Sequence, residues 1–124
     1  MDAIDRKNAL RERTKSFAAD IVRLFVSLDK VREELRVLGR QCLRSGTSVG
    51  AQYREASRAR SSEEFMAKID SCSQEADETQ FWLELLRDTC GVSRVQIDPL
   101  WKECDELISI FVTMSKRTKD NCSK

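Results

Sequence analysis

Six arginines lie between Leu35 and Ser62, where the only acid is Glu55, so this segment has a net charge of +5. The following segment, from Glu63 to Cys90, carries eight acids against two cations, a net charge of −6. If the first segment is helical, five of its arginines fall within a sector of roughly 80°, opposite its apolar side. This arginine stripe consists of Arg36, Arg40, Arg44, Arg54 and Arg58.

The arginine stripe has two interpretations, because a planar guanidinium group suits phosphate and carboxylate alike. In the first, the stripe follows the phosphate backbone of a nucleic acid. In the second, it is solvated or pairs with the acids of the following segment, from the same subunit or a neighbouring one. The near equality of the two opposite charges favours the second interpretation. The one aromatic residue nearby, Tyr53, falls towards the apolar side of the helix.

Three carboxylates, Glu55, Glu75 and Glu78, could lie close enough together to bind a divalent metal. Di-iron helical bundles, however, use Glu-x-x-His pairs, and this chain has no histidine. Carboxylates beside the seam of a bundle more often pair with arginine, and Arg44 is the obvious partner. We therefore expect a polar cluster here and no metal site.

Enzymatic chemistry is weakly indicated by the remaining residues. The chain lacks a histidine base, a nucleophile elbow and a glycine-rich phosphate loop. Gly46 and Gly50 match neither the dinucleotide-binding nor the Walker A spacing. We expect a protein that is not an enzyme, with no cofactor and no small-molecule substrate.

A second apolar face is expected on the acidic segment. Phe81 and Leu85 fall opposite the apolar seam of that segment, and Trp82 falls on its flank. A helix with two apolar faces needs two partners. The second partner is either the first or fourth helix of the same chain or another subunit, and the sequence leaves both open.

These residues must be positioned by helices, because apolar residues recur every three or four positions along most of the chain. The spacing predicts four helices, over about 14–29, 34–59 and 62–90, and from about 98, or a turn earlier, to 118. Ser61 and Glu64 form a capping-box pattern, Gly91 is a typical helix stop, and Pro99 suits a first helical turn. Short connections predict an all-α, antiparallel up-down-up-down four-helix bundle over residues 14–118. We expect a flexible segment at 1–13 and a frayed tail at 119–124.

Three glycines, Gly39, Gly46 and Gly50, interrupt the second predicted helix. Each costs about 1 kcal/mol relative to alanine, so we expect them to permit a close helix approach. The sequence does not say whether that approach is within the bundle or to another subunit.

The cysteines and the termini indicate a cytoplasmic protein. The five cysteines are odd in number and form no C-x-x-C motif, so a disulfide framework is not indicated. Cys42, Cys72 and Cys104 fit the apolar seams as small core residues. No apolar run reaches the roughly 20 residues needed to span a bilayer, and the charged first residues do not resemble a signal peptide. We expect no membrane association.

The sequence resembles a bacterial family known as four-helix bundle proteins, also described as proteins encoded in intervening sequences of large-subunit ribosomal RNA. The resemblance covers about Phe17 to Lys116 and is most specific at Arg44–Ala51, Arg54–Ala56, Ser61, Phe65, and from Glu75 through Glu78–Leu83. The chain has Gln52 where the family usually has asparagine, so an amide contact of the family is in doubt at that position.

This resemblance implies an antiparallel bundle that forms a homo-oligomer, typically a ring-like pentamer. The family's link to ribosomal RNA implies association with nucleic acid. A similar bundle, the accessory variability protein of diversity-generating retroelements, forms pentamers and serves a reverse transcriptase; this analogy is one of fold. We therefore predict a homo-oligomer that binds RNA, or an RNA-handling protein such as a reverse transcriptase, through the arginine stripe. The alternative is an assembly module whose arginines make subunit contacts and bind no nucleic acid.

Overall fold

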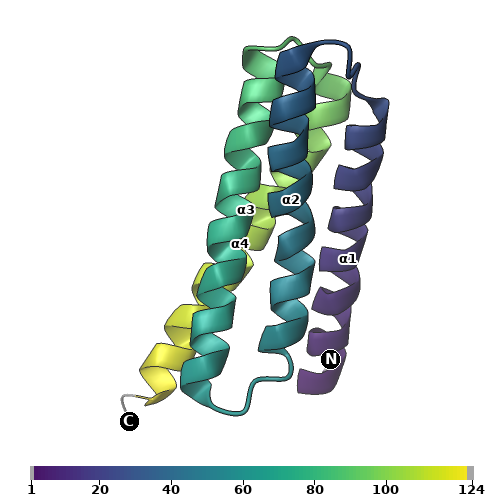
Figure 1. The fold of residues 1–124 in the computed structure, drawn as a ribbon. Coiled ribbons are helices and arrows are strands. Elements are labelled where there is room, and N and C mark those ends of the chain that lie inside the picture. Colours follow the sequence, from purple (N-terminus) through teal and green to yellow (C-terminus); the bar gives the residue numbers. More distant parts are fainter. Residues whose placement is uncertain (1, 123–124) are drawn as a thin grey trace.

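The computed structural model describes residues 2–122, which form four long helices arranged side by side (Figure 1). Each helix packs mainly against its neighbours in sequence, and α1 and α4 make few contacts with each other. Both ends of the chain lie at the same end of the bundle (Figure 1). The predicted all-α up-down-up-down bundle is thus confirmed. The helices are α1 (Ala3–Ser27), α2 (Glu33–Ala56), α3 (Ser62–Asp88) and α4 (Arg94–Cys122).

Helix α1 begins at Ala3, so the prediction of a helix start near Thr14 was wrong. The Asp2 side chain accepts a hydrogen bond from the Asp5 backbone N–H at 2.9 Å and caps the helix. Leu10 is buried and extends the apolar stripe of α1 by one turn. Most of the segment predicted to be flexible, residues 1–13, is therefore helical; Met1 lies outside the described residues.

Helix α4 begins at Arg94, a turn before Asp98, and contains Pro99 in its second turn. A proline has no N–H to donate, so its ring is tolerated only near the start of a helix. The helix continues to Cys122, beyond the predicted boundary at residue 118. Within the predicted frayed tail, residues 119–122 are helical, and residues 123–124 lie outside the described part of the chain.

The glycines of α2 face α1 of the same chain. A methyl group built at Gly46 would lie 2.8 Å from two carbon atoms of Ile21, and one at Gly39 would lie 2.7 Å from Leu28. At Gly50 the methyl group would lie 3.3 Å from the Thr14 carbonyl oxygen. A side chain at Gly46 would meet the branched carbon atoms of Ile21, and one at Gly50 would meet the backbone of Thr14, so these two glycines serve close packing inside the bundle.

The seam between α2 and α3 is narrow and partly polar. The hydroxyl groups of Ser45 and Thr79 are fully buried and hydrogen-bond each other at 2.7 Å. Thr79 also donates to the carbonyl oxygen of Glu75 at 2.7 Å, so both buried polar groups are satisfied. Cys42 and Cys72 are buried beside them as predicted.

The ends of α3 follow the sequence signals closely. The Ser61 hydroxyl accepts the Glu64 backbone N–H at 3.0 Å. The Glu64 carboxylate accepts from the Arg60 N–H at 3.2 Å, one residue before the donor that a capping box predicts. At the other end Gly91 has a φ of 75°, which explains why glycine occupies this C-terminal stop.

One arginine joins α1 to α4. Arg13 donates two hydrogen bonds to the Glu103 carboxylate, at 2.8 and 2.7 Å, and a third to Glu106 at 2.6 Å. The hydrogen bonding that Arg13 donates to Glu103 is the main cause that raises the pKa of Arg13. This Arg13 clamp lies where the two helices would otherwise separate.

None of the described helices is both long enough and apolar enough to span a bilayer.

Candidate functional site

The structure divides the arginine stripe into paired and unpaired members. Arg36 pairs with Glu33 of its own helix. Arg44 reaches across to α3, where it pairs with Glu78 and lies 3.5 Å from a carboxylate oxygen of Glu75. Both arginines therefore have carboxylate partners within the monomer, but only Arg44 pairs with acids of the following segment, as the second interpretation of the stripe predicts.

The other three members of the stripe are exposed and make no ion pair within residues 2–122. They are Arg40, Arg54 and Arg58. An exposed guanidinium without a carboxylate partner keeps its five donors for a ligand or for water. Two of these unpaired arginines, Arg54 and Arg58, thus lie at or just beyond the C-terminal end of α2. Arg40 lies more than three helical turns before them.

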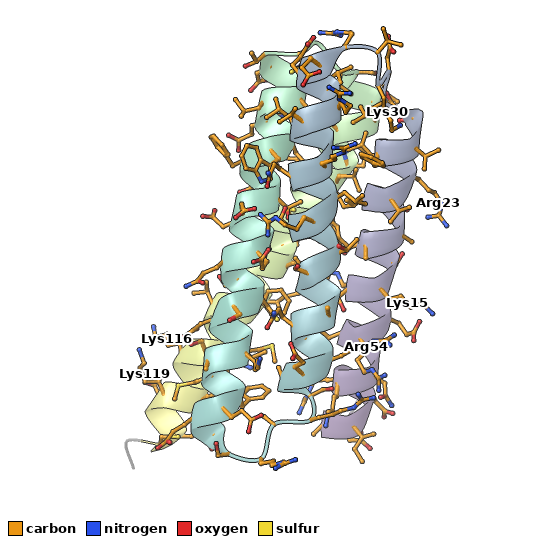
Figure 2. The ribbon with its side chains drawn as sticks, viewed as in Figure 1. Lys15, Arg23, Lys30, Arg54, Lys116 and Lys119 are labelled. Carbon is orange, nitrogen blue, oxygen red and sulfur yellow. The ribbon has the colours of Figure 1, made fainter. Side chains whose placement is uncertain are left out.

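Four cations gather around a hollow at the turn between α2 and α3. The hollow has a volume of about 370 Å³, and Figure 2 labels Arg54 near this end of the bundle. The N-terminus of α3 lies here, and its helix dipole adds positive potential. We call this surface the basic hollow; its lining residues are Arg54, Glu55, Arg58, Arg60, Glu64 and Lys68.

Both acids of the basic hollow are already engaged. Glu55 lies 3.6 Å from the ammonium group of Lys68, and Glu64 accepts the Arg60 backbone N–H. Arg54 and Arg58 make no such contact within the described chain. The arrangement can therefore bind an anion such as a phosphate group without first breaking an arginine–carboxylate pair.

The predicted polar cluster forms only in part. Arg44, Glu75 and Glu78 come together, and the Trp82 indole donates to Glu78 at 3.1 Å. Glu55 instead pairs with Lys68. No three acidic or cysteine side chains in residues 2–122 are grouped so that they could hold a metal ion.

Gln52 does not join that cluster. Its side chain is half-buried and makes no hydrogen bond within the part of the chain that the structure describes. The expected pairing of Glu55 with Arg44 was wrong, because Glu55 lies about three helical turns further along α2.

The second apolar face of α3 is left partly uncovered by its own chain. The Phe81 side chain is 51% exposed, and its ring centroid lies 5.1 Å from that of Trp82. Trp82 packs against the core, whereas Leu85 is half-buried. Neither α1 nor α4 covers Phe81, so a contact with another subunit stays a prediction.

Three of the residues that shape these surfaces were not identified from the sequence. Arg60 directly precedes the cap of α3, and Lys68 lies on the same face of α3 as Glu64, one turn further on. The capping-box pattern at Ser61 and Glu64 marks the start of α3 and could have drawn attention to both residues. Arg13 gave no comparable signal, because its partners are about 90 residues away.

The buried cysteines give no sign of nucleophilic chemistry. Burial raises the pKa of Cys42 and of Cys72 to about 12, and it also raises the pKa of Cys104. A thiol with a raised pKa is a poor nucleophile. These three side chains therefore contribute packing, as predicted.

Comparison with known proteins agrees with the all-helical fold. A crystal structure of a protein of unknown function from the S23 ribosomal protein family of Bacteroides thetaiotaomicron is similar, with a TM-score of 0.77 and 34% sequence identity. The alignment covers 89% of this chain and 97% of that one. No curated protein matches the sequence. Residues 6–113 match the 23S rRNA-intervening sequence protein family, and the chain therefore belongs to that family.

Proposed function

We propose that this protein is a non-enzymatic, homo-oligomeric helical bundle that binds RNA, or a protein that handles RNA, through unpaired arginines of α2. The observation that carries the proposal is the division of the arginine stripe. Arg36 and Arg44 have carboxylate partners, whereas Arg54 and Arg58 line the basic hollow without one. Arg40 extends the unpaired set along the helix.

The chemistry of the basic hollow suits a phosphate backbone. Arginine forks bind phosphate oxygens in pairs, and the N-terminus of α3 adds backbone donors and a favourable dipole. The family name refers to an intervening sequence in ribosomal RNA, which makes RNA the first ligand to test.

The homo-oligomer is proposed from Phe81. An aromatic side chain exposed over half of its surface, in tilted contact with the Trp82 ring and beside half-buried Leu85, is typical of an interface anchor. The family resemblance favours a pentamer. A Phe81→Asp variant should dissociate while keeping its helicity, as measured by light scattering and circular dichroism.

The RNA proposal is tested by replacing Arg54 and Arg58 with glutamine. Binding of a labelled single-stranded RNA should weaken, and the slope of log affinity against log salt should become shallower by about 1.4 for two lost contacts. Arg36→Gln is the matched control, because Arg36 lies on the same helix and already has a partner. An unchanged affinity and salt slope in the double variant would sink the proposal.

The alternative function, an assembly module without nucleic acid, is favoured by one specific observation. Arg44 already pairs with Glu75 and Glu78 of α3, and the same chemistry could join Arg54 and Arg58 to acids of a neighbouring subunit. In that case the Arg54→Gln/Arg58→Gln variant should dissociate into smaller species in the absence of RNA. Size exclusion with light scattering separates the two functions.

A further inference from the structure

The bundle has an open groove where α1 and α4 diverge, at the end that holds both termini (Figure 1). The groove has a volume of about 810 Å³. It begins near the Arg13 clamp and runs along α1 as far as Ala3, a distance of about 15 Å at 1.5 Å per residue. Its size and length suit a ligand much larger than an ion or a water cluster.

The groove is lined mainly by apolar and small side chains. Leu10, Phe65, Ile110 and Met114 supply most of its large apolar surface. Alanines at positions 3, 9, 56 and 59 leave hollows between them. Walls made of two long helices with small residues between large ones resemble the grooves that receive a third helix.

The charges of the groove are all of one sign. Arg6, Lys7, Arg13 and Arg117 line it, and none of its lining residues is acidic. Arg13 is neutralised by Glu103 and Glu106. The other three make no ion pair within residues 2–122, and they come from both walls. An occupant therefore needs an apolar face with acidic side chains on both flanks.

A second copy of this chain does not meet that requirement well. Two grooves packed face to face would oppose like charges. The acidic face of α3 around Phe81 lies sixteen residues beyond Phe65 on the same helix, about 24 Å along the bundle. A copy that placed this face in the groove would be shifted by that distance along the bundle, so the contact could close into a ring only if the subunits were also tilted.

We infer that the groove between α1 and α4 is a docking site for an amphipathic helix of another protein, with an apolar face and acidic flanks. RNA is disfavoured as the occupant because a phosphate backbone would leave the apolar floor uncovered. The Tyr53 ring at the floor is buried and does not provide a face on which bases could stack. The inference is independent of the basic hollow at the α2–α3 turn.

The test uses the full chain and a fluorescein-labelled synthetic peptide of about 14 residues, held helical by a lactam bridge because short helices are marginal in water. Leucine and alanine form one face of the peptide, and glutamate flanks it. We expect saturable binding in fluorescence anisotropy. A peptide with lysine at each glutamate position should bind at least about tenfold more weakly.

Two double variants test whether the peptide binds in the groove. Arg6→Glu combined with Arg117→Glu should weaken binding of the acidic peptide by about tenfold or more. The matched control, Lys15→Glu with Lys116→Glu, makes the same charge change on the same two helices outside the groove lining (Figure 2). The control should stay within about twofold of the original affinity.

Three outcomes would overturn the inference. The first is equal binding of the lysine peptide or equal loss in both variants, which would mean a non-specific charge effect. The second is that single-stranded RNA displaces the peptide and that Arg6→Glu/Arg117→Glu also abolishes this RNA binding, which would assign the groove to RNA. The third is binding that is seen only as the oligomer dissociates on dilution, which would assign the groove to a second copy. Loss of RNA binding in Arg54→Gln/Arg58→Gln with peptide binding kept would separate this site from the proposed function.

Discussion

Along its edge with α2, helix α1 packs against three glycines. Towards α4 it makes two polar links, a hydrogen bond from Gln96 to Ser27 at one end and the Arg13 clamp at the other, and beyond the clamp the two helices separate. At the first edge, added methyl groups would come within 2.7 to 3.3 Å of side-chain or backbone atoms of α1. At the second edge, the Arg13 clamp is followed by a groove of about 810 Å³. The same helix thus has one edge fixed by shape and one edge fixed by charge.

This difference shows how a four-helix bundle can be stable and still keep a binding surface. Close packing stabilises through dispersion and apolar burial and leaves no room for a ligand. An ion pair between long side chains holds two helices at a greater separation and leaves the space beyond it accessible. Four predictions test the contrast between the closely packed interior of the bundle and its more open ends and surfaces.

The largest expected contrast is in thiol reactivity. Burial raises the pKa of Cys42, in the closely packed seam between α2 and α3, from 9.0 to about 12, whereas Cys122 in the last turn of α4 is exposed. At pH 8 the higher pKa lowers the thiolate fraction of Cys42 about a thousandfold. Iodoacetamide should modify Cys122 first, with sites assigned by peptide mass spectrometry. Equal labelling of Cys42 in native buffer would mean that this seam opens readily; Cys122→Ser is the control.

The next effect is the loss of stability on filling the closed edge. Gly46→Val places branched carbon atoms where Ile21 already lies within 2.8 Å, so we expect destabilisation of about 3 kcal/mol in urea unfolding. Ala51→Val on the exposed side of α2 is the control and should cost about 0.6 kcal/mol from helix propensity alone. Ile21→Ala should partly rescue Gly46→Val. Equal costs at positions 46 and 51 would contradict close packing.

A smaller effect is expected from removing the clamp at the open edge. Arg13 and Glu103 are partly exposed, so Arg13→Ala should cost about 1 kcal/mol. Arg23→Ala removes a more exposed pair with Asp20 on the same helix and should change stability by less than about 0.5 kcal/mol. Thermal unfolding of the two variants measures the difference. If they are equally stable, the clamp does not hold α1 to α4.

The smallest effect concerns the opposite end of α4, where Arg87 joins Asp88 and Asp98. The hydrogen bond from Arg87 is the main cause that holds the pKa of Asp88 below its ordinary value of 3.8. A lowered folded pKa gives stability that is present above pH 3.8 and is lost as the pH falls through the folded value. Arg87→Gln should raise the pKa of Asp88 towards 3.8 in a carboxyl NMR titration. The same substitution at Arg23, which lies on α1 and pairs with Asp20, is the control and should leave the pKa of Asp88 unchanged.

Much of the fold could be predicted from local signals. The seams of α2 and α3, the Ser61 cap and the Gly91 stop each depend on residues within a few positions of one another, and all were confirmed. The start of α1 was missed because charged residues from Arg6 to Arg13 conceal the single apolar signal of Leu10. The prediction needed Asp2 to be recognised as a cap.

The candidate site was predictable only as a set of residues. The helical period placed five arginines on one side of α2, but their partners depend on the rotation of α3 against α2. That rotation brings Glu75 and Glu78 to Arg44 and takes Glu55 to Lys68. No short-range pattern contains this information, because the paired residues are separated in the chain by a helical hairpin.

The sequence by itself determined the number and order of the helices and the buried seams of α2 and α3, because period, caps and breakers act over one or two turns. It also determined membership of the family. Only the tertiary structure decided that the glycines of α2 face α1, that Arg54 and Arg58 remain without carboxylate partners, and that α1 and α4 diverge into a basic apolar groove. These features depend on the separation and rotation of whole helices, which follow from the packing of all side chains at once.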